Sequence, residues 1–140
     1  MVLSSNSEHK FMANKNVNTV EMPLVETTRL AAALDAFATE RDWHQFHSPK
    51  NLVMALSGEV GELTEIFQWM TESASRDAGR DPKTADKVRE ELADVLLYLV
   101  RLSDVLGVDL NEAASQKLQL NAQKYPAAKA RGSSKKYNEF

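Results

Sequence analysis

Residues 48–70 read SPKNLVMALSGEVGELTEIFQWM and predict one long amphipathic helix. Ser48 offers a capping hydroxyl, and Pro49 suits the first helical position because the N–H that it lacks would have no partner there. Apolar side chains then recur every three or four residues, which places them on one face of the helix. This apolar stripe consists of Leu52, Leu56, Val60, Leu63 and Phe67. We expect the helix to end near Met70.

The segment before this helix predicts a shorter one. Residues 26–41 have apolar side chains at helical spacing, and Thr27 or Thr28 provides the capping side chain. Residues 43–48, which lie between the two helices, are a predicted loop that contains two of the three histidines.

Two more helices are predicted after it. Asp81-Pro82 repeats the start signal and predicts a helix over residues 83–106, which Gly107 ends. Asp109 predicts the cap of a last helix. Pro126 prevents this last helix from continuing past about residue 125.

The chain contains no segment with strand alternation, no repeat and no second domain. Four helices with short connections predict an all-α fold arranged as a four-helix bundle. We expect the helical domain to span residues 25–126, with a polar loop at residues 71–81. Residues 1–24 would form a disordered arm or an appended extension, and residues 127–140 a basic tail.

The composition limits the class of protein. A chain of 140 residues has room for one core, and 43% hydrophobic with 26% charged residues is typical of a globular domain. A net charge of −3 offers no overall attraction to polymeric nucleic acid or to a membrane. No apolar run approaches the ~20 residues of a membrane span. The absence of cysteine excludes disulfides, thiolate zinc sites and a cysteine nucleophile, which fits a cytoplasmic protein.

Two acidic pairs lie beside the apolar stripes rather than opposite them. Glu59 and Glu62 form one pair, and Glu91 and Asp94 form the other. Residues three apart on a helix share a face, and carboxylates that face a bundle interior are costly unless a cation pairs with them. A ligand set of oxygens without histidine favours a hard ion, Mg²⁺, with Mn²⁺ as a substitute.

Other interpretations of these pairs stay open on sequence alone. Acidic pairs at this spacing are common on solvated helix faces. A di-iron bundle would need Glu-x-x-His motifs, whereas positions 62 and 94 are acidic. A non-catalytic interaction module would use the acids in salt bridges or partner contacts. A hydrolase of another phosphoanhydride, such as a dinucleotide or an alarmone, would use the same metal site.

Four motifs occur in order along the chain. They are RDWHQFHSPKNL (residues 41–52), LSGEVGELTEIFQW (residues 56–69), EELADVLLYL (residues 90–99) and NAQKYP (residues 121–126). This ordered series resembles the MazG-like, all-α nucleotide pyrophosphohydrolases, and within them the dCTP pyrophosphatase branch. The resemblance extends over about residues 30–137.

The resemblance implies a Mg²⁺-dependent enzyme that converts a nucleoside triphosphate to its monophosphate and pyrophosphate. The substrate would be dCTP or a related or non-canonical deoxynucleotide, as in a nucleotide-pool house-cleaning enzyme. Four residues would bind the metal and be catalytic, namely Glu59, Glu62, Glu91 and Asp94. One of the first two would hold or deprotonate the attacking water.

The resemblance also implies a nucleotide site that a neighbouring subunit helps to form, in a homo-oligomer with a tetramer favoured over a dimer. The residues lining this site would be Trp43, His47, Trp69, Tyr98, Lys117 and Asn121. The basic tail would close over the phosphates through Arg131, Lys135, Lys136 and Tyr137.

A purely structural interpretation of several of these residues stays open. Trp43 and Trp69 would be core residues, or would stack on a base at a pocket mouth. Tyr98 follows Asp94 by one helical turn and therefore shares its face. The amide of Asn121 would face solvent, or would donate to and accept from a base edge.

Overall fold

The computed structural model describes residues 22–139, and all regular structure among these residues is helical. The long helices are α1 (Thr28–Glu40), α2 (Pro49–Phe67), α4 (Ala85–Leu106) and α5 (Leu110–Lys124). The short ones are α3 (Glu72–Ser75), α6 (Ala127–Ala130) and 3-10 turns at His44–Phe46 and Tyr137–Glu139. The prediction of an all-α fold is confirmed. Residues 1–21 of the predicted N-terminal arm lie outside the described residues.

Three of the predicted helix ends are held by the expected groups. α2 begins at the predicted residue, and the Ser48 hydroxyl accepts the N–H of Asn51 at 3.2 Å. α5 begins after Asp109, whose carboxylate accepts the N–H of Glu112 at 2.9 Å. Gly107 ends α4 with φ of 67°, a left-handed conformation that glycine adopts without steric cost.

Two predicted helix starts are two residues too early. At α1 the Glu26 carboxylate, rather than a threonine hydroxyl, accepts the N–H of Thr28 at 2.7 Å. Before α4 the Asp81 carboxylate accepts the N–H of Lys83 at 2.9 Å, so Asp81-Pro82 forms a turn ahead of the helix instead of its first residues. α2 also ends earlier than predicted, at Phe67.

The predicted loop at residues 71–81 contains one helical turn, α3. The hydroxyl of Thr71 caps it by accepting the N–H of Ala74 at 3.1 Å. None of the helices in residues 22–139 has an apolar run long enough to cross a membrane.

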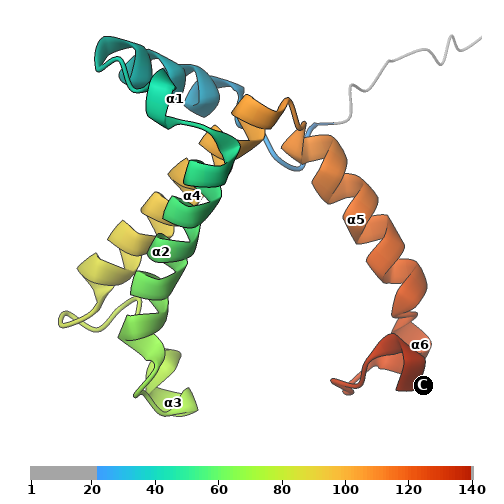
Figure 1. The fold of residues 1–140 in the computed structure, drawn as a ribbon. Helices are drawn as coiled ribbons and strands as arrows, with labels where there is room; N and C mark the ends of the chain where they lie inside the picture. Colours follow the sequence, from blue (N-terminus) through green and yellow to red (C-terminus); the bar gives the residue numbers. More distant parts are fainter. Residues whose placement is uncertain (1–21, 140) are drawn as a thin grey trace, which may run out of the picture.

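The core of the molecule lies between α1, α2 and α4. α2 and α4 run antiparallel and side by side, and α1 packs across the end of α4 (Figure 1). Leu52, Val88 and Val100 are buried between these helices. The α2–α4 pair is the scaffold on which both acidic motifs are placed.

α5 diverges from this core, so the prediction of four helices closing a bundle within one chain is wrong. Figure 1 shows α5 leaving the end of α4 and pointing away from α2. α5 has no buried residue, and its Leu118 and Leu120 are exposed. Without a broad apolar face toward α2 and α4, the helix gains too little from burial to fold back onto them.

Candidate metal centre and adjoining pocket

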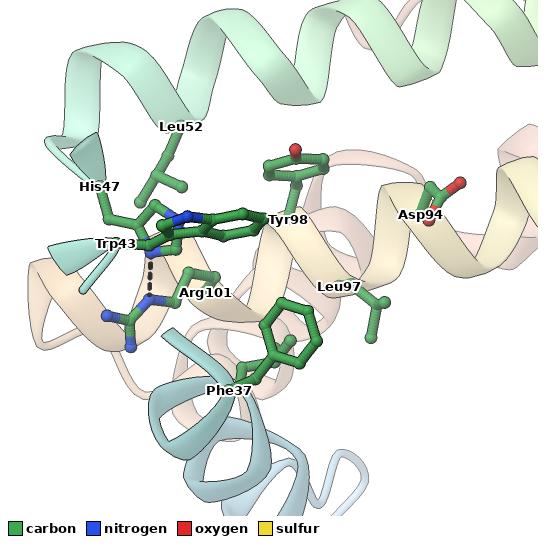
Figure 2. Close-up of a pocket in the computed structure, with 9 residues that line it drawn as sticks. Phe37, Trp43, His47, Leu52, Asp94, Leu97, Tyr98 and Arg101 are labelled. Carbon is green, nitrogen blue, oxygen red and sulfur yellow. Dashed lines mark hydrogen bonds between the residues drawn. The ribbon is translucent and has the colours of Figure 1, made fainter. Parts of the chain in front are cut away.

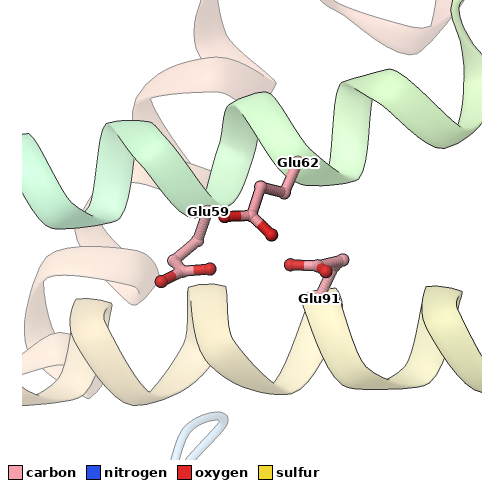
Figure 3. Close-up of side chains that lie close together, drawn as sticks. All are labelled: Glu59, Glu62 and Glu91. Carbon is pink, nitrogen blue, oxygen red and sulfur yellow. The ribbon is translucent and has the colours of Figure 1, made fainter.

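Three carboxylates converge between the two central helices. Glu59 and Glu62 come from α2, and Glu91 comes from α4 on the opposite side of the gap (Figure 3). One carboxylate oxygen from each of the three lies within 4.8 Å of the others. The antiparallel packing of α2 on α4 brings these oxygens together, because each acidic motif faces the other helix.

Glu91 is the most deeply placed of the three, with 1% of its surface exposed. Its Oε2 atom is buried and accepts no hydrogen bond from any described residue. An unpaired carboxylate oxygen in a protein interior is costly, and most such groups have a partner. The free lone pairs of Oε2 fit a cation.

Lys87 is the one lysine whose ammonium group reaches this acidic cluster in the described structure. Its Nζ contacts Oε1 of Glu91, one turn along α4, and lies 3.9 Å from Oε2 of Glu62 and 3.6 Å from Oε2 of Glu90. The hydrogen bond to Glu91 is the largest cause that raises the pKa of Lys87 above its ordinary value. A single ammonium is therefore shared among several carboxylates.

The electrostatics of Glu59 indicate that the cluster still has excess negative charge. Desolvation is the largest cause that raises the pKa of Glu59, and the charges of Asp94, Glu62 and Glu91 raise it further. Lys87 acts in the opposite direction without cancelling them. A divalent ion with oxygen ligands matches this set of donors.

Asp94 lies next to the three glutamates but is not one of the converging set. It lies one turn after Glu91 on α4. From there its charge helps to raise the pKa of Glu59, and its side chain lines the neighbouring pocket. The structure thus brings three of the four predicted ligands together, and the metal role of Asp94 stays a prediction.

A cavity of about 170 Å³ opens beside the acidic cluster, bounded by α1, α2, α4 and the segment between α1 and α2 (Figure 2). Its walls are mainly apolar and aromatic. The lining residues are Leu34, Phe37, Trp43, His47, Leu52, Asp94, Leu97, Tyr98 and Arg101. Of the nucleotide-site residues predicted from sequence, Trp43, His47 and Tyr98 therefore lie on one pocket.

Trp43 is a pocket wall rather than a core residue, since 43% of its surface is exposed. Its ring meets Phe37 edge-to-face at 5.7 Å and His47 at 6.3 Å between ring centres. Aromatic walls held in this way suit a flat heterocycle. Sequence reasoning did not assign Phe37 to the site, because its spacing on α1 is that of an ordinary core residue.

Arg101 closes the end of the pocket and is only 5% exposed. Its guanidinium donates from Nε to Nδ1 of His47 at 3.1 Å, and from Nη1 to Asp35 at 3.0 Å and to Asp104 at 3.3 Å. Sequence reasoning also missed this residue. The available signal was its position two turns after Asp94 on the same face of α4.

The other predicted nucleotide-site residues lie elsewhere in the single chain. Trp69, just after the end of α2, is 89% exposed and does not line the pocket. The remaining ones lie on α5 or beyond it, and they are Lys117, Asn121, Arg131, Lys135, Lys136 and Tyr137. Because α5 diverges from α2 and α4 (Figure 1), one chain does not bring them to the acidic cluster. Their roles stay predictions.

Comparison with known proteins gives consistent matches. The sequence profile described as the MazG-like family matches residues 54–140. Two relatives named dCTP pyrophosphatase 1 match over 104 residues, or 74% of this chain, with 52% identity for the protein of Homo sapiens and 48% for that of Mus musculus. The chain spans 61% of the length of these relatives.

A solved structure is similar as well. It is described as a pyrophosphatase from Archaeoglobus fulgidus and superimposes with a TM-score of 0.65 at 40% sequence identity. The match covers 70% of this chain and 90% of that one.

Proposed function

This chain belongs to the MazG-like family, and we propose that it hydrolyses a nucleoside triphosphate to the monophosphate and pyrophosphate. The similarity to proteins named dCTP pyrophosphatase 1 supports dCTP, or a related or non-canonical deoxynucleotide, as the substrate. A broad preference within this class would suit the removal of unwanted nucleotides before polymerases use them.

The observation that supports this proposal most directly is the convergence of three carboxylates around an unpaired buried oxygen of Glu91. A solvated acidic face would leave these groups apart in water. Glu59, Glu62 and Glu91 would hold Mg²⁺, with Asp94 as a fourth ligand. Mn²⁺ prefers the same oxygen donors and would substitute.

When bound, Mg²⁺ would neutralise phosphate oxygens and make a water molecule more acidic. Glu59 is the better of the two proposed bases because its pKa is raised, whereas Glu62 is more exposed. Its carboxylate would hold a water molecule for attack on the α-phosphorus, and pyrophosphate would leave. Basic side chains of the tail would stabilise the charge on this leaving group.

The cavity beside the cluster would hold the base. A triphosphate bound at the acidic cluster would extend its nucleoside toward Trp43 and Tyr98, since Asp94 belongs to both regions. The apolar walls would favour stacking, and the small volume would favour one ring system over a larger ligand.

A second copy of the chain would complete the site. α5 and the basic tail are too far from the acidic cluster of their own chain to act on it (Figure 1). Meanwhile α4 exposes a row of large apolar side chains at helical spacing, formed by Leu92, Leu96 and Leu99. Rows of this kind commonly mark protein interfaces. We propose a homo-oligomer, with a tetramer favoured over a dimer, in which α5 of one copy serves a neighbour.

The test of the proposed activity is a panel of deoxynucleoside and ribonucleoside triphosphates, assayed for pyrophosphate with and without Mg²⁺. Release of one pyrophosphate per monophosphate, only in the presence of the metal and fastest with dCTP or a cytosine analogue, is the expected result. Release of inorganic phosphate alone, or no turnover with any triphosphate, would contradict it. Measuring the melting temperature at increasing Mg²⁺ concentrations distinguishes an enzyme from an interaction module. The enzyme should be stabilised by the metal, whereas an interaction module needs no Mg²⁺.

A further inference from the structure

We propose that Arg101 is a positioning residue that fixes His47 in the tautomer with its proton on Nε2, so that the pocket offers a neutral N–H donor to its ligand. The identity of the ligand as a nucleotide base rests on the proposed function, whereas the tautomer does not.

A guanidinium group has five N–H donors and no acceptor. The bond from Nε of Arg101 to Nδ1 of His47, at 3.1 Å, therefore requires Nδ1 of the ring to be unprotonated (Figure 2). A neutral imidazole with a bare Nδ1 has its proton on Nε2. Arg101 thus selects one tautomer of His47 and excludes the doubly protonated ring.

The partners of Arg101 keep its guanidinium in place. Asp35 of α1 and Asp104 of α4 each accept a bond from Nη1, at 3.0 and 3.3 Å. Because Arg101 is buried and paired with two carboxylates, it has little freedom to turn away from His47.

His44 also accepts a hydrogen bond from Arg101 through its Nδ1 atom, as His47 does. Its Nδ1 lies 2.9 Å from Nη2 of Arg101 and must accept that bond, so its own proton is on Nε2. Nε2 lies 2.9 Å from the Thr39 hydroxyl, which donates its proton to the carbonyl of Asp35 and so is free to accept. Each donor in the chain of bonds therefore has an acceptor, which supports the assignment at His47.

The other ring nitrogen of His47 has no hydrogen-bond partner among residues 22–139, although the residue lines the cavity. The groups that face this histidine do not favour a charged ring. Burial is the largest cause that lowers the pKa of His47, followed by the positive charge of Arg101 and by His44. The carboxylates of Asp35 and Asp104 are paired with Arg101 rather than with His47.

The chemical consequence is a preference for an acceptor on the ligand. A ring N–H in a pocket of low polarity favours a carbonyl oxygen or an unprotonated ring nitrogen and disfavours an amino group at the same position. A base edge that presents an acceptor there, as the carbonyl of a pyrimidine does, would be selected over one that presents a donor.

The test of the tautomer is ¹⁵N NMR of the histidine rings in the full chain without nucleotide. The expected spectrum shows a protonated Nε2 and a bare Nδ1 for His47 near neutral pH. In Arg101→Met the expected result is a mixture of tautomers and a higher His47 pKa, because one opposing charge is gone. The matched control is Arg89→Met, an exposed arginine on the same helix that pairs with Asp86, and it should leave the His47 signals unchanged.

A proton on Nδ1 of His47 in the unmodified protein would overturn the proposal, and this measurement needs no variant to fold. Unchanged His47 signals in a folded Arg101→Met variant would also overturn it. With a nucleotide substrate, Arg101→Met should raise KM roughly tenfold while kcat changes less, as expected for the loss of a hydrogen bond to the base. Failure of nucleotide turnover in every form would reject the proposed function and leave the tautomer result standing.

Discussion

The ammonium group of Lys87 contacts the buried carboxylate of Glu91, one turn further along α4. Glu91 has one oxygen in this ion pair and the other without a partner. Because Lys87 also lies near Glu62 on the facing helix, its charge partly neutralises the place where a divalent ion would bind. Lysine and a bound metal ion would therefore compete for the same carboxylates.

Replacing this lysine is expected to change stability and metal affinity in opposite directions. Lys87→Met leaves the buried charge of Glu91 uncompensated, so the metal-free protein should melt at a lower temperature. Mg²⁺ would no longer displace an ammonium group, so its binding should become several-fold tighter. Calorimetric titration with Mg²⁺ and thermal melts in EDTA measure the two effects.

The control for this experiment is Lys83→Met, which removes the same charge from a lysine whose ammonium makes no ion pair in the described structure. It should leave the Mg²⁺ affinity nearly unchanged. Weaker Mg²⁺ binding in Lys87→Met than in the unmodified chain would show that the lysine assists the metal instead of competing with it.

Glu59→Gln is expected to remove turnover while the fold is retained. The amide keeps the shape of the side chain but is a poor base and a weak metal ligand, so kcat should fall by about 10²-fold or more. Pyrophosphate release and circular dichroism are the measurements. Glu65→Gln, on the same helix and outside the converging acids, is the matched control. Near-normal turnover in Glu59→Gln would remove this residue from the site.

The raised pKa of Glu59 predicts that the stability of the metal-free protein depends on pH. Desolvation and the charges of the neighbouring acids raise the pKa of Glu59 above its ordinary 4.5, so the folded state holds this proton more tightly than the unfolded chain does. The stability contributed by protonated Glu59 is fully present below about pH 4.5 and is lost as the pH rises through the raised pKa.

Melting temperatures of the unmodified chain and Glu59→Gln, measured in EDTA across this range, isolate that contribution. The variant should melt at a higher temperature near neutral pH, because its amide feels no charge repulsion, and the two curves should converge at acidic pH. A constant difference between the two proteins at all pH values would mean that the Glu59 carboxyl has no unusual proton affinity in the fold.

Leu96→Asp is expected to dissociate the proposed homo-oligomer. The leucine lies in the exposed apolar row on α4 between Leu92 and Leu99, where a charge buried against another copy would be costly. Sedimentation velocity should give a multiple of the chain mass for the unmodified protein and a smaller species for the variant. Ser73→Asp places the same charge on exposed α3 and should leave the mass unchanged. A monomeric unmodified protein would contradict the oligomer.

The long helices and the acidic character of the cluster could be predicted from local sequence. Ser48, Asp109 and Gly107 define helix ends through bonds to residues a few positions away, so their effect is readable along the chain. The boundary error at α1 arose where the Glu26 carboxylate took the capping role assigned to a threonine. The error at α4 arose where Asp81, the assigned cap, instead bonds within a turn that precedes the helix.

Acidic pairs at three-residue spacing beside apolar stripes were likewise a sequence property, because helix geometry alone places such pairs on one face. Which of these acids converge, namely Glu59, Glu62 and Glu91, depended on how α2 packs against α4. That packing is a contact between segments distant in sequence, and local periodicity does not specify its register. The same packing separated Asp94 from the converging oxygens and left Oε2 of Glu91 without a partner.

Local sequence therefore determined where the long helices form and which acidic side chains share a helix face beside the apolar stripes. The tertiary structure alone decided that α5 stands apart from the core, that Arg101 meets His47 across 54 positions of the chain, and that Lys87 pairs with the buried acid. The physical reason is that helix formation depends on neighbours within a few residues, whereas burial, charge pairing and pocket shape depend on which helix faces meet in space.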